Sequence, residues 1–277
     1  MLSRQAMMCT QRTLSFYEYT LVKIFEWLDK NGVTSLDQIS SRHIRAFLGE
    51  MAARGCKDSY IHTFARAFKT FARFLEQEGY VSHSIKVTMP KIVQSPLTVY
   101  DVAQIKQILL FCADNRDKAF ISLMVDSGLR NAEVRALNWG DVDLASSIII
   151  VRCGKGRKTR TVMVGIKTRR LLLKYRNEID HTDIAPLFQT NSGGRFTESG
   201  LQSWMRRLSK RARIQITPNA QRRIFAMLSL RAGMNVFQLQ GLLGHSSLEM
   251  THHYVTLLDE DLIDAHQKHG PVDNLLA

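Results

Sequence analysis

The chain has 277 residues, with 38 Lys and Arg against 25 Asp and Glu, a net charge of +13 and an isoelectric point near 9.8. A hydrophobic fraction of 45% can form a sizeable core, which excludes disorder over most of the chain. No apolar stretch approaches a membrane span of roughly 18–20 residues, and no secretion segment stands out. The four cysteines lack zinc-type spacing. We therefore expect a cytoplasmic protein with reduced thiols and no membrane partner. The basic excess favours a polyanionic partner, nucleic acid first.

Helical patterns fill the first third of the chain. Apolar residues recur at helical spacing from 16 to 28, from 44 to 51 and from 58 to 79. On the third helix, Arg66, Lys69 and Arg73 form a basic ridge opposite the apolar stripe. Such a ridge is either a solvated face or a DNA contact, and the sequence leaves both interpretations open.

A domain boundary follows these helices. Periodicity fails from 87 to 99, where Pro90 and Pro96 interrupt the chain. We therefore expect a helical domain over 1–90, a linker over 91–98 and a second domain over 99–277. Both parts carry a basic excess, which favours a two-domain clamp around the polyanion over a single binding tail.

The second domain begins with a helix that runs to about Cys112, for which Thr98 and Asp101 provide the expected start signal. Further helices are predicted over 115–126, 131–138, 166–178, 198–213, 219–232, 236–243, 247–255 and, weakly, 258–268. Between them, the β-rich segments 147–153 and 161–164 flank GKGRKTR, which predicts a hairpin. The expected fold class is mainly α with a small antiparallel β-sheet in the second domain.

Common motifs for other chemistries are missing from the sequence. It has no GxxxxGK[ST], no GxGxxG after a strand and no GxSxG. His245, His252 and His253 lie close together without a matching carboxylate or cysteine cluster, so we expect no metal site and no cofactor.

A sparse set of basic residues offers a different chemistry. In DSGLR, Arg130 follows a helix-ending glycine, and Glu133 lies one turn further on, where it could hold the guanidinium. Lys155 lies at the predicted hairpin tip. Arg222 falls near the start of the 219–232 helix, and His245 follows the helix stop LLG.

Together with Tyr254, which stands 9 residues beyond the histidine, these residues resemble the tyrosine site-specific recombinases, or phage-integrase family. The motifs are SGLRNAEVRAL, CGKGRKTRTV, LSLRAGMNVFQLQGLLGHSS and the HYV around Tyr254. The resemblance covers nearly the whole chain and is nearest to Xer-like and mobile-element integrases. It implies a SAM-like core-binding domain followed by a catalytic domain, closed as a clamp on DNA.

The resemblance also implies a role for each residue. Tyr254 would attack the scissile phosphate to form a 3′-phosphotyrosyl bond, and Arg130 and Arg222 would stabilise the charge on the nonbridging oxygens. Lys155 would protonate the leaving 5′ oxygen, and His245 would hydrogen-bond the phosphate. Such a recombinase needs neither ATP nor a metal ion.

One position departs from the family pattern. Asn219 stands where the family usually has a second histidine, and Gln221 replaces an apolar residue. Because an amide has no proton to exchange near neutral pH, we expect attenuated strand cleavage. The main alternative is a catalytically degenerate DNA-binding protein of the same fold. A nicking-closing topoisomerase shares the site chemistry, but the separate N-terminal domain disfavours it.

Two basic clusters without acidic residues are expected on the DNA backbone. They are Arg152, Lys155, Arg157, Lys158 and Arg160 around the hairpin, and Arg206, Arg207, Lys210, Arg211 and Arg213 on the 198–213 helix. The resemblance further implies how protomers associate. A tail over 258–277 would pack on a neighbouring protomer, giving a homo-oligomer on DNA with four protomers expected. The target site, the direction of recombination and any accessory proteins stay open.

Overall fold

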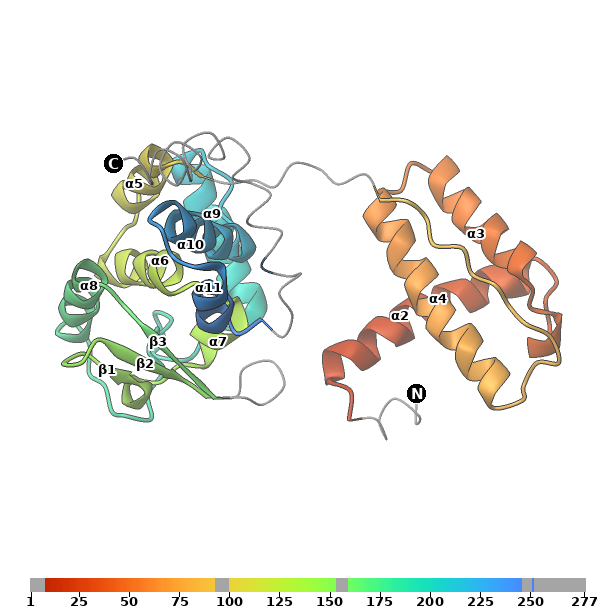
Figure 1. The fold of residues 1–277 in the computed structure, drawn as a ribbon, viewed down its shortest axis with the longest axis horizontal. Coiled ribbons are helices and arrows are strands. Elements are labelled where there is room, and N and C mark those ends of the chain that lie inside the picture. Colours follow the sequence, from red (N-terminus) through yellow and green to blue (C-terminus); the bar gives the residue numbers. More distant parts are fainter. Residues whose placement is uncertain (1–7, 93–99, 153–158, 246–250, 252–277) are drawn as a thin grey trace, which may run out of the picture. The chain divides into compact units, whose positions relative to one another are not determined.

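The computed structural model describes residues 8–92, 100–152, 159–245 and 251 (Figure 1). The chain divides into two compact units, residues 1–96 and 97–277, which are described separately below. The linker that we predict over 91–98 lies mostly outside the described residues, so the predicted domain bounds stay a prediction. Among the helices described, none is long and apolar enough to cross a membrane.

In unit 1, long helices pack around one apolar core. They are α2 (Gln11–Lys30), α3 (Ser41–Ala53) and α4 (Asp58–Gln77), with a short 3-10 helix, η1 (Leu36–Gln38), after α2. The hydroxyl of Thr10 starts α2 by accepting a hydrogen bond from the amide of Thr13. Phe64 of α4 is buried, and its ring contacts Tyr19 of α2 and Phe47 of α3. This one aromatic side chain therefore joins the three helices at the core.

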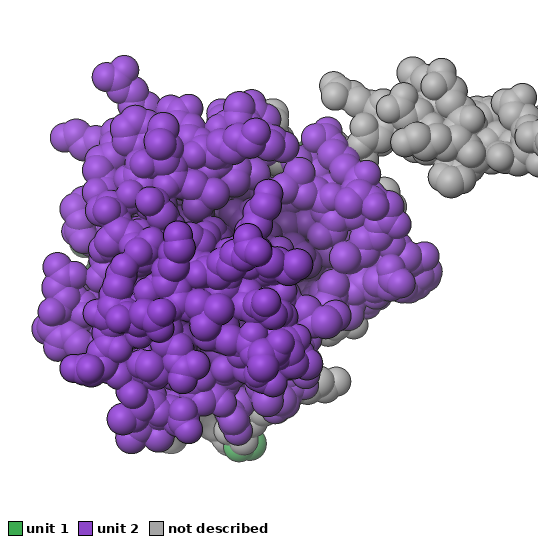
Figure 2. Space-filling model, turned by 90° about the vertical axis from the view of Figure 1, so that its left-hand side faces the viewer, with its two compact units in different colours: residues 1–96 green, residues 97–277 purple. Residues whose placement is uncertain are grey.

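Unit 2 is mainly helical. Its helices are α5 (Val102–Leu110), α6 (Asn115–Ser127), α7 (Asn131–Ala136), α8 (Ile166–Arg176), α9 (Glu198–Ala212), α10 (Pro218–Arg231) and α11 (Val236–Leu243), with a 3-10 turn, η2 (Trp139–Asp141). The central helix is α6, which packs against both α8 and α10 (Figure 1). Its residues Ala119, Phe120, Leu123 and Met124 are almost completely buried. Figure 2 shows unit 2 from the side on which α8 lies, with a hollow in its surface.

The start of unit 2 differs from the prediction in one detail. Asp101 itself caps α5: its carboxylate accepts from the amide of Gln104 at 2.7 Å, and the Gln104 side chain accepts from the Asp101 amide at 3.0 Å. This reciprocal pair is a complete capping box. The expected pairing of Thr98 with Asp101 is therefore wrong, because Asp101 occupies the cap position and not the third residue of the helix.

The small sheet is antiparallel and has the strand order β1 (Val142–Asp143), β2 (Ile148–Val151), β3 (Arg160–Met163). Ile149 pairs with Val162 across β2 and β3, and both are buried. The β2–β3 hairpin and the fold class are thus confirmed, while β1 is an additional strand. The helices predicted over 247–255 and 258–268 lie outside the described residues, apart from position 251.

Candidate active site

The turn between α6 and α7 presents Arg130. Gly128 ends α6 in the left-handed region (φ +60°), and a Cβ there would lie only 2.4 Å from Cδ1 of Phe225. Only glycine fits both the backbone conformation and the space. The next turn is closed by Glu133, whose carboxylate accepts from the backbone amide of Arg130 at 2.7 Å and from its guanidinium at 2.9 Å. The prediction that Glu133 holds this guanidinium is confirmed.

The C-terminus of α11 gathers three arginines. The carbonyls of residues 242, 243 and 244 accept in turn from Nε of Arg160 (3.3 Å), Nη2 of Arg222 (2.6 Å) and Nη2 of Arg130 (3.2 Å). The helix ends at Gly244 in the left-handed region (φ +63°), so these carbonyls have no partner within the helix. Because the negative end of the helix dipole lies here, it favours three cations side by side.

Arg222 connects two helix ends. It is buried at 6% exposure, and its Nη1 donates to the carbonyl of Gly128 at 2.5 Å while Nη2 reaches the end of α11. Its helix starts with Thr217 as the cap and Pro218 in the first turn, a good combination for a helix start. Residues that are more than 90 positions apart in the sequence therefore share one hydrogen-bonding centre.

Glu133 provides the negative charge of this cluster. It is 7% exposed, and both its oxygens accept from Arg160, each at 2.7 Å. Burial by itself would raise the pKa of Glu133, but the hydrogen bonds from Arg160 and from the Arg130 amide outweigh it and lower the pKa to about 2. Glu133 is therefore ionised near neutral pH, and together with the two arginines it leaves one net positive charge.

His245 lies directly after the end of α11. Its Nδ1 is 2.8 Å from the hydroxyl of Thr251, a side chain that is fully buried. A buried partner at Nδ1 fixes the orientation of the ring. Sequence reasoning did not find Thr251, since a threonine three residues before a tyrosine carries no signal of its own.

The other predicted site residues are not all part of this cluster. Asn219 is exposed on the first turn of α10 and forms no side-chain hydrogen bond within the described part of the chain. Lys155, Arg157, Lys158 and Tyr254 lie outside the described residues. Their roles stay predictions.

The predicted DNA contacts fall into two groups. On α4 and α9 the side chains are exposed, as a backbone contact requires: Arg66, Lys69, Arg73, Arg206, Arg207 and Lys210. Arg160 differs, because its side chain is only 14% exposed and its guanidinium is bound to Glu133. The geometry does not support the expectation that Arg160 lies on the DNA backbone.

A polar side chain is buried next to Arg222. Gln221 is 1% exposed, and neither its amide nitrogen nor its amide oxygen has a hydrogen-bond partner within the described residues. Burying an unpaired amide costs free energy.

The described part of the chain contains no group of three or more His, Cys, Asp or Glu side chains placed to bind a metal ion.

Comparison with protein families identifies the chain. The model of the phage integrase family matches residues 98–261, and the model of the phage integrase N-terminal SAM-like domain matches residues 5–79. The chain belongs to the phage integrase family. Among its relatives, the tyrosine recombinase XerA of Saccharolobus solfataricus is 32% identical over 92% of this chain and 86% of that protein. The tyrosine recombinase XerC of Oceanobacillus iheyensis is 27% identical over 95% of this chain and 91% of that protein.

Solved structures of other recombinases share the fold of this phage-integrase-family chain. A crystal structure of XerA recombinase is 26% identical, covers 97% of this chain and 95% of that one, and has a TM-score of 0.57. XerH bound to palindromic difH has a TM-score of 0.74 at 21% identity, covering 91% of this chain and 78% of that one. The Tn1549 transposon integrase with circular intermediate DNA has a TM-score of 0.73 at 20% identity, covering 89% and 90%.

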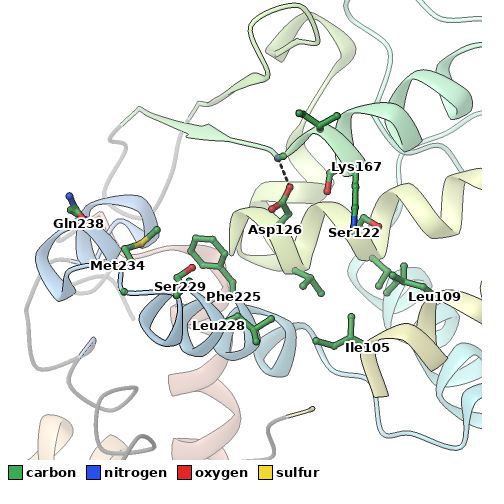
Figure 3. A pocket seen from close by; sticks show the side chains of 17 residues that line it. Ile105, Leu109, Ser122, Asp126, Lys167, Phe225, Leu228, Ser229, Met234 and Gln238 are labelled. Carbon is green, nitrogen blue, oxygen red and sulfur yellow. Dashed lines mark hydrogen bonds between the residues drawn. The ribbon is translucent and has the colours of Figure 1, made fainter. Parts of the chain in front are cut away.

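Unit 2 also contains an apolar groove of about 780 Å³ between α5, α6, α10 and the start of α8 (Figure 3). Ile105 of α5 and Phe225 and Leu228 of α10 line its walls. At one edge, the carboxylate of Asp126 accepts from the amide of Gly165 at 2.6 Å, which ties α6 to α8. A groove of this size and polarity suits a short apolar segment of protein.

Proposed function

We propose that this chain is a site-specific DNA recombinase that cleaves and rejoins DNA strands through a 3′-phosphotyrosyl intermediate at Tyr254. The observation that carries the proposal is the convergence of Arg130, Arg222 and His245 at the C-terminus of α11. Two guanidinium groups and an imidazole, assembled from three separate segments, form a preorganised site for a phosphate. Membership of the phage integrase family and the full-length similarity to tyrosine recombinases agree with it.

In this reaction the oxygen of Tyr254 attacks the scissile phosphorus while its phenolic proton passes to solvent. The bond from phosphorus to the 5′ oxygen breaks, its electron pair leaves with that oxygen, and Lys155 supplies the proton that completes the 5′-hydroxyl. A 5′-hydroxyl from another strand then returns its proton to Lys155 and attacks the phosphotyrosine, the bond from phosphorus to the tyrosine oxygen breaks, and Tyr254 regains its proton from solvent. Because each step exchanges one phosphate ester for another, no energy from ATP is needed.

The arginines stabilise the charge that develops on the phosphate. Arg130 and Arg222 present planar guanidinium groups whose positions are fixed by backbone carbonyls and Glu133. In enzymes that stabilise a charged transition state with preorganised hydrogen-bond donors, loss of one donor lowers the rate about 10²–10³-fold. His245, oriented by Thr251, donates a further hydrogen bond to a phosphate oxygen.

Asn219 attenuates the cleavage step in this proposal. It stands on the exposed first turn of α10, one turn before Arg222, and it cannot exchange a proton near neutral pH. The Asn219→His variant should therefore cleave faster than the natural chain on a nicked suicide duplex. An Asn219→His variant that cleaves no faster contradicts the attenuation.

DNA binding involves both units. The exposed cations of α4 and α9 contact phosphates, which fixes the register of the duplex without reading its bases. Binding then weakens steeply with salt because phosphate contacts release counterions. A gel-shift affinity that is unchanged between 50 mM and 200 mM NaCl, a range of roughly fourfold in salt, contradicts this interface.

Protomers join on DNA through their C-terminal segments. Residues 258–277 include the apolar Leu262, Ile263 and Leu275, and the groove between α5, α6 and α10 offers an apolar acceptor on a neighbouring protomer. A chain truncated after Thr256 should bind a single half-site duplex normally but lose the higher complexes, with four protomers expected for the full chain. An equal yield of those complexes from the truncated chain overturns this assignment.

One assay tests the function. The full chain first selects its site from a randomised duplex pool, and a nicked form of that duplex then traps the cleaved strand. A covalent adduct in a denaturing gel that is lost in Tyr254→Phe supports the proposal. Binding without an adduct indicates a degenerate DNA-binding protein, and relaxation of supercoiled DNA without the site indicates a topoisomerase.

A further inference from the structure

We propose that Arg160 is a positioning residue for strand cleavage, which holds Arg130 in place through Glu133 and does not contact the DNA backbone. The proposal rests on the proposed function of the site. It assigns a role to a side chain that the hairpin pattern alone places among the DNA-binding cations.

Each of the three guanidinium nitrogens of Arg160 has a hydrogen-bond partner. Nη1 and Nη2 donate to the two oxygens of Glu133 at 2.7 Å each, and Nε donates to the carbonyl of Leu242 at 3.3 Å. Such a fork-to-fork pair fixes both planes. Both Nη atoms of Arg160 are bound to a carboxylate, whereas those of Arg222 are bound to neutral backbone carbonyls, so the charge of Arg160 is already matched within the protein.

Glu133 transmits this constraint to Arg130. The same carboxylate accepts from the Arg130 amide at 2.7 Å and from its Nη1 at 2.9 Å. Arg130 therefore uses one nitrogen on Glu133, whereas Arg160 uses two. Without Arg160, the carboxylate is free to form its own two-bonded pair with Arg130 and to turn that guanidinium away from the phosphate.

Charge leads to the same conclusion. Glu133 and Arg130 alone form a neutral pair, which would stabilise a dianionic transition state poorly. Arg160 supplies the second cation, so that the trio keeps one positive charge for the phosphate. The role of Arg160 is thus to satisfy Glu133 and leave Arg130 available.

Arg160 also supports the second partner of Arg130. The carbonyl of Gly244 accepts from Arg130, and a Cβ on Gly244 would lie 3.1 Å from Cδ of Arg160. The stem of Arg160 thus packs against the turn that supplies this carbonyl. Since Arg160 is the first residue of β3, it anchors the sheet to the end of α11.

The experiment compares single-turnover cleavage with DNA affinity, using the full chain and a nicked duplex selected by the chain from a randomised pool. Arg160→Gln should cleave at least about 30-fold more slowly with saturating DNA, while the dissociation constant changes less than about threefold. The matched control is Arg170→Gln, which removes one charge from an exposed arginine of α8. Arg170 has no hydrogen-bond or ion-pair partner among the described residues, so its variant should cleave within about twofold of the natural rate.

Arg160→Lys keeps the charge and so provides a test if Arg160→Gln fails to fold. A lysine can serve a backbone phosphate but cannot form the fork on Glu133. Positioning predicts slower cleavage at unchanged affinity, whereas a backbone contact predicts unchanged cleavage. A substrate with sulfur as the 5′ leaving atom, which needs no proton, should not restore the rate; full restoration would place the effect on Lys155 and overturn the proposal.

A double variant tests the route through Glu133. Adding Arg160→Gln to the Glu133→Gln variant should slow cleavage little further, because the two residues act as one unit. If the rate loss of the double variant is the product of the two single losses, the proposal is contradicted. The salt dependence of binding decides independently of cleavage. If Arg160→Gln reduces the slope of log affinity against log salt by about one, Arg160 contacts a phosphate and the proposal is overturned. This result holds even if the natural chain forms no adduct and the proposed function itself fails.

Discussion

Replacing Glu133 by glutamine should make the stability of unit 2 less sensitive to acid. The pKa of Glu133 is lowered from its ordinary value near 4.5 to about 2 in the folded protein. Its ionised form therefore stabilises the fold fully above about pH 5, and this contribution is lost as the pH falls from 5 towards 2. This difference in pKa corresponds to a contribution of about 3 kcal/mol to the free energy of unfolding, of which about 2 kcal/mol is lost by pH 3.

Urea unfolding at pH 7 and at pH 3, followed by tryptophan fluorescence, measures this loss. In a Trp27→Phe background the signal comes from Trp139 and Trp204, which are both buried in unit 2. Glu133→Gln should be destabilised by about 3 kcal/mol at pH 7, because two arginines lose their partner. At pH 3 the difference in the free energy of unfolding between the variant and the parent should be smaller by about 2 kcal/mol.

The control is Asp180→Asn, which removes an exposed carboxylate of the same unit that has no ion-pair partner among the described residues. In this variant the free energy of unfolding should differ between pH 7 and pH 3 by the same amount as in the parent. If Glu133→Gln lies below the parent by the same amount at both pH values, Glu133 is not held ionised by the arginines.

Three further substitutions test the surroundings of the cluster. Gln221→Leu should raise the free energy of unfolding by about 1–2 kcal/mol in the same urea assay, because it removes a buried amide without partners; a destabilised variant would show that the amide is satisfied in solution. Gly128→Ala should lower stability by about 2–4 kcal/mol, since the new Cβ meets Phe225 in a left-handed turn, and an unchanged urea midpoint refutes this. Thr251→Val should slow single-turnover cleavage about tenfold at unchanged DNA affinity through loss of the bond to His245; equal rates would mean that the hydroxyl does not orient the ring.

Much of the fold follows from local patterns in the sequence. Helical periodicity predicts α2, α3 and α4 closely, and the glycines around the β-rich segments predict the β2–β3 hairpin. The strand β1 has only two residues, too few for any alternation to show. The cap of α5 is predicted three residues too early, because Thr98–Asp101 and Asp101–Gln104 are capping patterns of the same kind.

Among the described residues, the sequence pointed to Arg130, Arg222 and His245 but not to all the contacts that join them. Arg130 and Glu133 are one helical turn apart, so their contact follows from spacing alone. The pairing of Arg160 with Glu133 joins residues 27 positions apart, and a basic residue in a basic segment gives no sign of burial. Thr251 is likewise identified only by its place against His245.

The central claim is that Tyr254 becomes covalently linked to DNA, and mass spectrometry of the trapped adduct tests it most directly. Trypsin should release residues 232–268 as one peptide, and Tyr254 is its single tyrosine. After cleavage of the nicked, self-selected duplex and nuclease trimming, this peptide should carry a 3′-linked nucleotide on Tyr254. A nucleotide on any other residue, or an adduct that persists in Tyr254→Phe, would contradict it.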